Sequence, residues 1–579
     1  MLKFVKNYYP LLFILLLGLI LRIWGISWDW PLSSTTGDEI KIISGSLNMI
    51  NDASLFPRYV GGTYMPLMYY LHLPAIAVYA AFLFVSGHVH SINDIKNSVV
   101  MDLGNWLMIS RFISVFLGCL SIFLMYLVSQ RIFNNKTVSY IAALLFAVSP
   151  LNVALGHFGK IWTPQVFFLI LSLYLSLRFW QNSDRKPSFK MVFFTALFIL
   201  FSFAVNLVGA LAYPLLLLIL FVYYCECNWK RFFTFLISRW SILLHLLLVV
   251  GVALVFLVAP DSFKVYGLVF GIFFTVTSGA SVQEQGPMWE LPWWQKTGLV
   301  FDIFLQFETI IFLLLVPAFW LLYKKSKKIF CFLFLSFLGF FILLCPPLVD
   351  TTRPRYLTLL IPLMILPVAY LIKVVIDQFS SKRRWLIPII ILVAVMQNIF
   401  INARYDRLLQ KGSTKLSAYD WIKDNVSPDQ KVFLAGYYLL QDLPPDKELV
   451  SLVKQYSPEY YSTRLKYLED NFLDKPQWQG YGVYSDGFFC QWPEEVRSKI
   501  KFDYIIIADS GPGNFDFKDF KICGSQPSYD LTEKTPVFRQ ETAPYYRYTI
   551  DSGISLESYG PLWRIKKLGK ELSIYKTDK

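Results

Sequence analysis

The chain has 579 residues, of which 55% are hydrophobic and only 16% charged, and its mean hydropathy is +0.47. A soluble globular protein of this length is less apolar, so the composition excludes that class and indicates a polytopic membrane protein. The formal net charge of +14 suggests nucleic-acid binding at first sight. However, Lys and Arg occur mostly in short clusters between hydrophobic spans, as in cytoplasmic membrane loops. We therefore exclude nucleic acid as a partner.

The N-terminal region predicts the first membrane crossing. Residues 1–9 are basic, and residues 10–26 form a largely apolar run. No small-residue cleavage site follows this run, and tryptophans at its end are typical of an interfacial belt. We therefore interpret it as a transmembrane helix with the N-terminus inside, not as a signal peptide.

Ten further apolar runs, mostly of about 20 residues, are long enough to cross the hydrocarbon core. They lie near residues 106–130, 137–150, 165–180, 191–208, 211–227, 237–259, 299–323, 329–346, 355–377 and 385–402. The basic loops between them fall on the cytoplasmic side only if residues 64–87 do not cross. We therefore predict that residues 64–87 lie along or dip into the outer surface. This gives about eleven crossings and an external C-terminus.

The first external segment carries Asp38, Glu39 and Lys41 directly after the first span. Charges at or near a membrane surface need a reason to be there, so these residues are candidates for function. A second interpretation is structural, because Thr36 and Glu39 have the spacing of a capping box and Asp38 suits the positive end of a helix dipole. The apolar residues that follow lie on one face and predict a helix in the interface: Ile40, Ile43, Leu47 and Ile50.

Other predicted external segments also carry unusual polar residues. Residues 151–164 contain His157, Lys160 and Trp162, and residues 260–298 form a long aromatic segment with Trp289, Trp293 and Trp294 beside Glu284 and Glu290. A further segment ends in Arg353-Pro354-Arg355-Tyr356 and leads directly into a span. With the predicted topology these groups converge on the face that holds Asp38 and Glu39, which capping alone does not explain.

The composition changes near residue 410, so we predict a transmembrane domain at 1–409 and an α/β domain at 410–579 outside the cell. The expected elements are helices at 413–426, 462–473 and 494–501, strands at 431–438 and 502–508, and a hairpin at 562–575. Cys490 and Cys523 are candidates for one disulfide in an external domain. The region contains no Walker loop, Rossmann glycine signature or metal-spaced His/Cys cluster, and we interpret it as an accessory or recognition module.

An ordered set of motifs in residues 12–377 resembles the C-type (GT-C) glycosyltransferases, membrane enzymes that use polyprenyl-phosphate-linked sugars. The set consists of Asp38-Glu39 after the first helix, Ser110-Arg111-Phe112, Ser149-Pro150, and Arg353-x-Arg355-Tyr356-Leu357. The nearest branches are the protein O-mannosyltransferase-like enzymes and the lipid A aminoarabinose transferase. Many relatives carry an acidic residue in the second external loop, where this chain has His157 and Lys160. This departure weakens the case for a two-carboxylate metal site.

The resemblance implies transfer of a sugar from a polyprenyl-phosphate donor at the outer face of the cell membrane, with inversion. The acceptor is a protein, a lipid or a glycan. A transporter or flippase of lipid-linked saccharides is the alternative from another class, and a catalytically inert assembly partner is a third. Transporters place their charges near the bilayer midplane and show related halves, whereas these charges gather at one face.

Asp38 is the candidate base, because a hydroxyl acceptor is a poor nucleophile at neutral pH. Glu39 orients Lys41 or an acceptor group, or helps to ligate a divalent metal ion with His157. The candidates for holding the donor phosphate are Arg353 and Arg355, with Lys41, Arg58, Lys160 and Tyr356 as further donor-binding residues. Structural alternatives remain: arginines at a helix end extend to lipid headgroups, a lone histidine forms hydrogen bonds, and Arg111 has a packing role.

Overall fold

The structure is a computed structural model of the whole chain. It describes residues 2–33, 37–57, 66–182, 184–260, 293–344, 354–380, 385–435 and 442–509, together with shorter stretches between 520 and 577. The chain forms two compact units. A helical unit contains Met1–Ile26, Lys41–Ile76 and Ile109–Asp406, and a mixed unit contains Ser27–Ile40, Ala77–Met108 and Arg407–Lys579. The mixed unit thus combines the C-terminal part with two segments from the first 108 residues.

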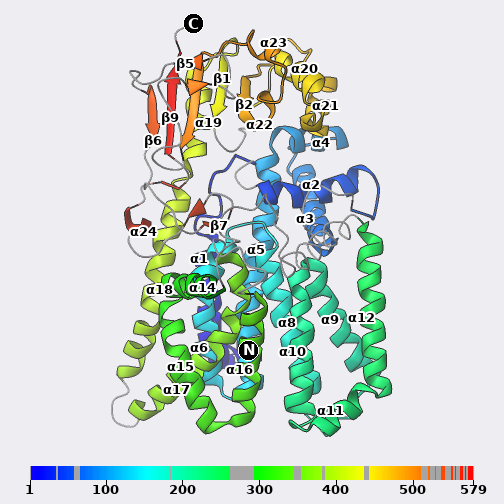
Figure 1. Cartoon of the computed structure of the whole chain (residues 1–579), viewed down its shortest axis with the longest axis vertical. Helices are drawn as coiled ribbons and strands as arrows, with labels where there is room; N and C mark the ends of the chain where they lie inside the picture. Colours follow the sequence, from blue (N-terminus) through cyan, green and yellow to red (C-terminus); the bar gives the residue numbers. More distant parts are fainter. Residues whose placement is uncertain are drawn as a thin grey trace. The chain divides into compact units, whose positions relative to one another are not determined.

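The helical unit consists of helices that are mostly long and apolar (Figure 1). Their bounds, including the short 3-10 segments η1 and η4 and the π-helical segment η2, are α1 (Leu2–Ile23), α2 (Gly37–Asn51), α3 (Pro66–Val85), α5 (Leu103–Phe133), α6 (Lys136–Ala147), α7 (Pro150–Gly156), α8 (Trp162–Trp180), α9 (Phe189–Val205), η1 (Leu207–Leu211), α10 (Ala212–Ile219), η2 (Leu220–Tyr224), α11 (Trp229–Leu236), α12 (Arg239–Val258), α14 (Trp293–Phe307), α15 (Thr309–Lys325), α16 (Lys327–Leu344), η4 (Pro354–Leu359), α17 (Ile361–Ser380) and α18 (Leu386–Gln410). Four of them, α2, α3, α5 and α18, pass from one unit into the other.

Within the described residues, eight helices are long and apolar enough to cross a membrane, or up to ten if each of two bent pairs is one span. This confirms a polytopic helical membrane protein. The predicted single span at 299–323 is wrong in detail, because the chain bends by 111° between Val300–Phe307 and Thr309–Lys325. The helix Pro66–Val85 also meets the length and hydropathy criteria, so its predicted surface position stays a prediction. In Figure 1 α2 runs across the direction of α9 and α12, as expected of an interfacial helix.

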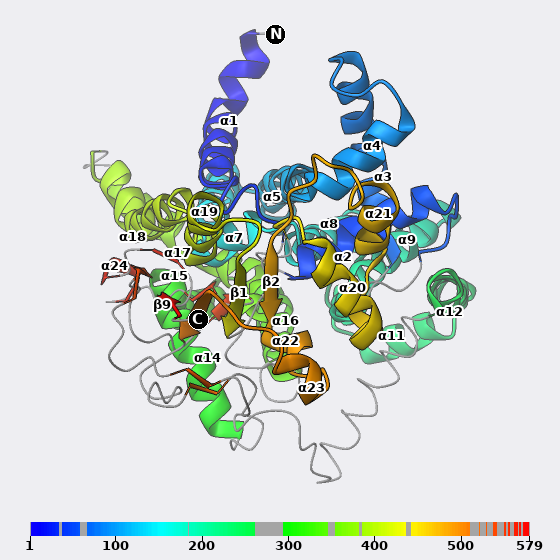
Figure 2. The same ribbon diagram turned by 90° about the horizontal axis from the view of Figure 1, so that it is seen from above.

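Helix α17 forms the centre of the helical core. Its residues from Ile361 to Ala369 are buried, and it packs against α6 and α15. In contrast, α12 lies at the edge of the unit in both views (Figures 1 and 2), and only Ser241 and Leu244 of its residues are buried. A helix that is apolar on an exposed face fits contact with lipid rather than water. The burial pattern thus separates the core helices from those expected to face the bilayer.

The mixed unit contains a five-stranded sheet of order β2-β1-β3-β9-β6, in which β2, β1 and β3 are parallel and β9 and β6 are antiparallel to their neighbours. The strands are β1 (Lys431–Ala435), β2 (Gly482–Ser485), β3 (Tyr504–Asp509), β6 (Phe538–Gln540) and β9 (Glu571–Lys576), with small ladders of β4 (Phe520–Lys521) with β5 (Ser528–Tyr529) and β7 (Thr549–Asp551) with β8 (Ile554–Ser555). The helices are α4 (Ile92–Met101), α19 (Thr414–Asn425), α20 (Lys447–Tyr456), η5 (Pro458–Tyr460), α21 (Thr463–Asn471), α22 (Asp486–Phe489), α23 (Glu494–Arg497) and α24 (Pro561–Arg564).

Alternation along the strands gives the sheet two buried faces. Val432 packs with Ile422 of α19 on one face, and Phe433 packs with Phe489 and Trp492 on the other. Burial on both faces is expected for parallel strands connected by helices. The prediction of an α/β domain is therefore confirmed.

One predicted element of this domain is wrong. Residues 562–575 do not form a hairpin, because Pro561–Arg564 is helical and Glu571–Lys576 pairs with β3 and β6. The strand pattern was local, whereas its partners lie far away in the sequence. Cys490 is disulfide-bonded, as expected of an external domain, while Cys523 lies outside the described residues.

Candidate active site

Helix α2 carries the predicted catalytic carboxylates. Glu39 is completely buried and Lys41 is half-buried, whereas the structure describes the backbone of Asp38 but not its side chain. Complete burial is rare for a glutamate unless its carboxylate has a partner, so we expect Glu39 to be paired within the protein. Thr36 of the proposed capping box lies outside the described residues.

Helix α2 buries one of its faces in the protein. Ile42 and Ile43 are fully buried, whereas Ile50 is 52% exposed. The reason is the close approach of α3, since a Cβ on Gly45 would lie 2.3 Å from the ring of Tyr69. Ser46 Oγ also lies 3.1 Å from the Tyr69 carbonyl oxygen, to which it donates. Helix α2 is therefore packed against α3, and the contact of its apolar residues with the membrane interface stays a prediction.

The loop that contains His157 and Lys160, predicted as the second external segment, is held in the protein interior. His157, Lys160 and Trp162 are all at least 95% buried, between the end of α7 and the start of α8. The Lys160 ammonium lies 5.9 Å from the centre of the Phe158 ring. A lysine is almost never buried to this extent without interactions, so this loop is packed in a defined conformation.

The Arg-Tyr segment meets this loop. Arg355 Cζ lies 5.0 Å from the centre of the Trp162 ring and 5.4 Å from that of Tyr356, and the Trp162 and Tyr356 rings meet edge to face at 4.8 Å. Contact with two aromatic rings restricts the position of the guanidinium. The predicted convergence of Arg355, Tyr356 and the second loop is therefore present. Arg353 and Arg58 lie outside the described residues.

Ser149-Pro150 starts α7 and is held by a residue that we did not predict. Glu308, at the bend between α14 and α15, is completely buried and accepts from Ser149 Oγ. Its Oε1 also lies 3.4 Å from the backbone nitrogen of Leu151. A carboxylate near the first turn of a helix is stabilised by the helix dipole. Glu308 thus anchors the helix that leads into the second loop.

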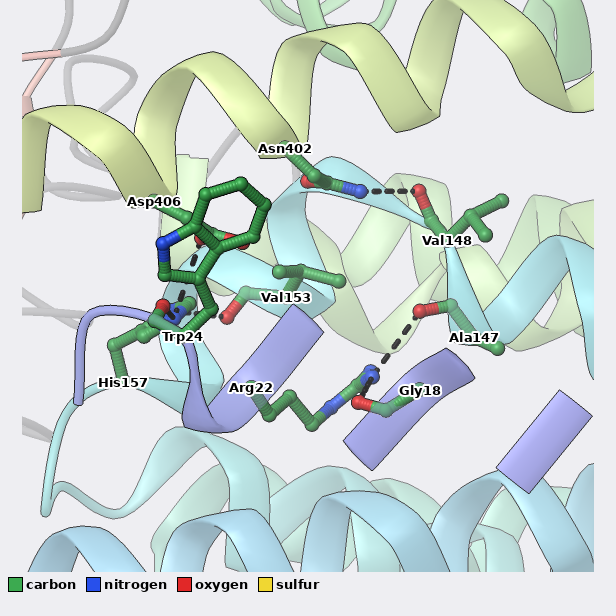
Figure 3. Close-up of polar contacts among 9 residues, drawn as sticks. All are labelled: Gly18, Arg22, Trp24, Ala147, Val148, Val153, His157, Asn402 and Asp406. Atoms are coloured by element: carbon green, nitrogen blue, oxygen red, sulfur yellow. Dashed lines mark hydrogen bonds and ion pairs between the residues drawn. The ribbon is translucent and has the colours of Figure 1, made fainter. Parts of the chain in front are cut away.

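A second group missed from the sequence joins α1, α7 and α18 (Figure 3). Asp406 Oδ1 lies 3.3 Å from His157 Nε2, and both side chains are fully buried. The other members donate to the chain between α6 and α7: Arg22 Nη1 lies 3.1 Å from the Ala147 oxygen, and Asn402 Nδ2 lies 2.9 Å from the Val148 oxygen. For Arg22 the available signal was its position within a predicted span, because charged residues there are rare and usually functional or paired.

The contacts of His157 bear on the metal hypothesis. Its Nδ1 lies 2.9 Å from the Val153 oxygen, and its Nε2 lies 2.9 Å from the Trp24 oxygen and close to Asp406. Both ring nitrogens therefore face protein oxygens, which favours the hydrogen-bonding interpretation over the role of a ligand. Among the described residues, no three His, Cys, Asp or Glu side chains form a group suited to a metal ion.

Arg111 has the packing role that we considered. It is 2% exposed, and its Nη1 lies 2.9 Å from the carbonyl oxygen of Ile26, to which it donates. This contact ties α5 to the end of the first span. The pairing of Arg111 with Asp38 or Glu39 stays a prediction.

Comparison with known proteins gives a family match to one part of the chain. The family model of dolichyl-phosphate-mannose-protein mannosyltransferases matches residues 98–194. The resemblance to GT-C glycosyltransferases is thereby confirmed. The matched segment runs from α4 into α9 and includes Arg111, Ser149, Lys160 and Trp162. A comparison with curated proteins finds no match.

Among solved structures, the chain is similar to the archaeal oligosaccharyltransferase AglB from Archaeoglobus fulgidus in complex with an inhibitory peptide and a dolichol-phosphate. The identity is 13%, the TM-score is 0.46, and the match covers 87% of this chain and 70% of that one. ArnT from Cupriavidus metallidurans bound to undecaprenyl phosphate also matches at 13% identity and a TM-score of 0.46, over 86% of this chain and 93% of that one. A further AglB structure, at 14% identity and a TM-score of 0.43 over 86% and 68% of the two chains, is a complex with Zn and sulfate.

Proposed function

We propose that the chain transfers a sugar from a polyprenyl-phosphate-linked donor to a protein, lipid or glycan acceptor at the outer face of the cell membrane, with inversion. The stack of Arg355 on Trp162 and Tyr356 beside the Lys160 loop is the observation that carries this proposal. Part of this arrangement lies in the segment that matches the mannosyltransferase family. A planar guanidinium and a nearby ammonium suit a phosphate that departs as an anion.

In this proposal, each group has one task. Asp38 takes the proton of the acceptor hydroxyl as the new bond to the sugar forms, while the bond between the sugar and the phosphate oxygen breaks. Arg355 and Lys160 hold the phosphate that leaves, together with Arg58, Arg353 and Lys41, which the sequence offers as further donor-binding residues. Glu39 orients Lys41 or the acceptor. A divalent metal ion near Glu39 belongs to the same hypothesis, and the zinc complex of AglB concerns that protein.

The proposal is tested with the purified full-length chain in detergent and a panel of polyprenyl-phosphate sugars. We expect the wild type to release free polyprenyl phosphate in the presence of an acceptor mixture, and Asp38→Asn to lose at least about 100-fold in rate, as removal of a general base does. Asp52→Asn is the matched control, because Asp52 is an exposed carboxylate just beyond the end of α2. Equal rates for Asp38→Asn and an active wild type would remove Asp38 as the base. Absence of release from every donor would instead favour a transporter or an inert partner.

A further inference from the structure

The C-terminal part of the chain shares one compact unit with two segments from the first 108 residues. Ser27–Ile40, which ends in Asp38 and Glu39, and Ala77–Met108 both belong to this mixed unit, together with Arg407–Lys579. Side chains of charged and polar residues make the connections. Their arrangement suggests a purpose beyond recognition of an acceptor.

The first connection is made by Asp29. This residue is 1% exposed, and its φ of 56° lies in the left-handed region that non-glycine residues rarely adopt. Its Oδ1 accepts a hydrogen bond from the backbone nitrogen of Ser413, directly after Gly412. The next residue, Thr414, donates to the carbonyl oxygen of Leu568 over 2.9 Å. The turn before α19 is therefore fixed both to the first external segment and to the C-terminal end of the fold.

The second connection is made by Asp442. Its Oδ1 accepts from the backbone nitrogen of Ser33 over 2.7 Å and also from the Ser33 hydroxyl. Ser33 is 4% exposed, so this double contact is shielded from water and strengthened by the negative charge of the acceptor. Burial lowers the pKa of Arg464, and the nearby Asp442 carboxylate opposes that shift. Asp442 thus faces both Ser33 and Arg464.

Arg464 in turn holds the other segment. Its Nε lies 2.9 Å from the Val100 carbonyl oxygen at the end of α4, and Tyr467 Oη lies 2.9 Å from Asn97 Oδ1 on the same helix. Helix α21 therefore presents two side chains to α4. Neither Arg464 nor Tyr467 belongs to the apolar core clusters of the sheet.

The two flanking segments are also bound to each other. Trp30 Nε1 donates to Asn105 Oδ1 over 2.7 Å. At Gly104 a Cβ would lie 2.0 Å from the carbonyl oxygen of Pro31, so only glycine permits this approach. Both segments and the C-terminal part thus form a closed set of contacts around the chain that enters α2.

We infer that the C-terminal part positions the helix that carries Asp38 and Glu39, and that Asp29 and Asp442 are its positioning residues. The inference rests on the proposed function, since it assigns a purpose to the same catalytic segment. Ser33 precedes the first residue of α2, Gly37, by four positions, so fixing Ser33 restricts where α2 can begin. Catalysis depends on this restriction because a misplacement of about 1 Å costs about 100-fold in rate.

The test compares Asp442→Ala and Asp442→Asn with Asp474→Ala in the purified full-length chain. Asp474 is an exposed carboxylate of the same unit that pairs with Lys447, and it makes none of the connections described above. We expect Asp442→Ala to lower kcat by about 10- to 100-fold with little change in KM for the lipid donor. The asparagine variant keeps an acceptor for Ser33 and should recover most of that loss. Asp474→Ala should match the wild type.

Hydrogen–deuterium exchange gives a second measurement that does not need activity. Asp442→Ala should raise exchange in peptides that cover residues 27–33 and leave the strands β1 and β3 protected. A purely structural defect would instead raise exchange in the strands and lower the thermal midpoint of the whole unit. Unchanged exchange at 27–33, or an unchanged kcat in a folded and active background, would overturn the inference. If the wild type releases no lipid phosphate, the proposed function fails, while the exchange measurement still decides whether the segment is held.

Discussion

Replacing Arg355 by alanine tests the proposed phosphate-binding role most directly. Arg355 is 7% exposed and lies over the rings of Trp162 and Tyr356. A hydrogen bond to a charged group contributes about 1.5–3 kcal/mol and a cation–π contact about 0.5–1 kcal/mol. Because the cation–π contact lies within the protein, only the hydrogen bond to the phosphate counts toward kcat/KM. Its loss corresponds to a fall of about 12- to 140-fold in kcat/KM, at 1.4 kcal/mol for each factor of ten.

Arg355→Lys separates charge from geometry. Lysine keeps the positive charge but loses the planar fork and the stacking surface, so we expect a smaller loss of about tenfold, or about 1.4 kcal/mol. Arg185→Ala, in the exposed loop between α8 and α9, is the control and should stay within about 0.5 kcal/mol of the wild type. Rates of polyprenyl phosphate release over a range of donor concentrations provide both kcat and KM.

One result would refute the reasoning about Arg355. If Arg355→Ala keeps kcat/KM within about threefold, or about 0.7 kcal/mol, and unfolds at the same temperature as the wild type, the stack is a packing feature. If activity and the unfolding temperature fall together in the alanine variant, the lysine variant decides. A folded lysine variant with full activity would show that only the charge matters.

Two predictions concern stability. Asp406→Leu should lower the free energy of unfolding by about 1–3 kcal/mol, because it removes a buried polar partner of His157 Nε2. Exposed Asp377→Ala should change the free energy of unfolding by less than about 1 kcal/mol. Thermal unfolding in one detergent compares the two variants, and equal midpoints would contradict the pairing. Asp446 caps α20, since its side chain accepts a hydrogen bond from the Leu449 nitrogen over 2.6 Å. Burial raises the pKa of this carboxyl, so the folded state holds the proton more tightly than the unfolded state. The free energy of unfolding therefore falls as pH rises through the folded pKa of Asp446. Asp446→Asn keeps the cap and should raise stability at pH 7 but not in acid, as chemical unfolding at both pH values would show; a less stable variant at pH 7 would contradict this sign.

Hydropathy predicted the helices whose environment is uniform along their length. Residues 237–259 and 329–346 became α12 and α16 within a few positions, because a long apolar run has few alternatives in a bilayer. The predicted span at 299–323 failed at Glu308, where the chain turns by 111°. The carboxylate was visible in the sequence, but its partner Ser149 is far away along the chain. Contacts of that kind leave no periodic signal.

Contacts between distant parts of the sequence also decide the arrangement of the candidate site. The motifs singled out Arg355, Tyr356 and the second loop as candidates, because each lies directly beside a predicted span. Their mutual contact depends on how α8 and η4 pack, which no local pattern contains. Asp406 was missed because it follows the predicted end of its span. Helix α18 continues to Gln410 and carries Asp406 into the protein interior.

The second loop carries basic residues at the place where many related enzymes carry an acidic one. The sequence has His157 and Lys160 where many relatives have an acidic residue, which counted against a metal site of two carboxylates. In the structure, His157 is directed toward Asp406 and the Trp24 oxygen, while Lys160 remains in the loop that meets Arg355 through Trp162. A loop that contributes cations instead of carboxylates suits direct binding of a leaving phosphate. In the proposed function His157 fixes the loop while Lys160 and Arg355 bind the donor, so we expect His157→Gln to lower the thermal midpoint of unfolding more than it lowers donor affinity.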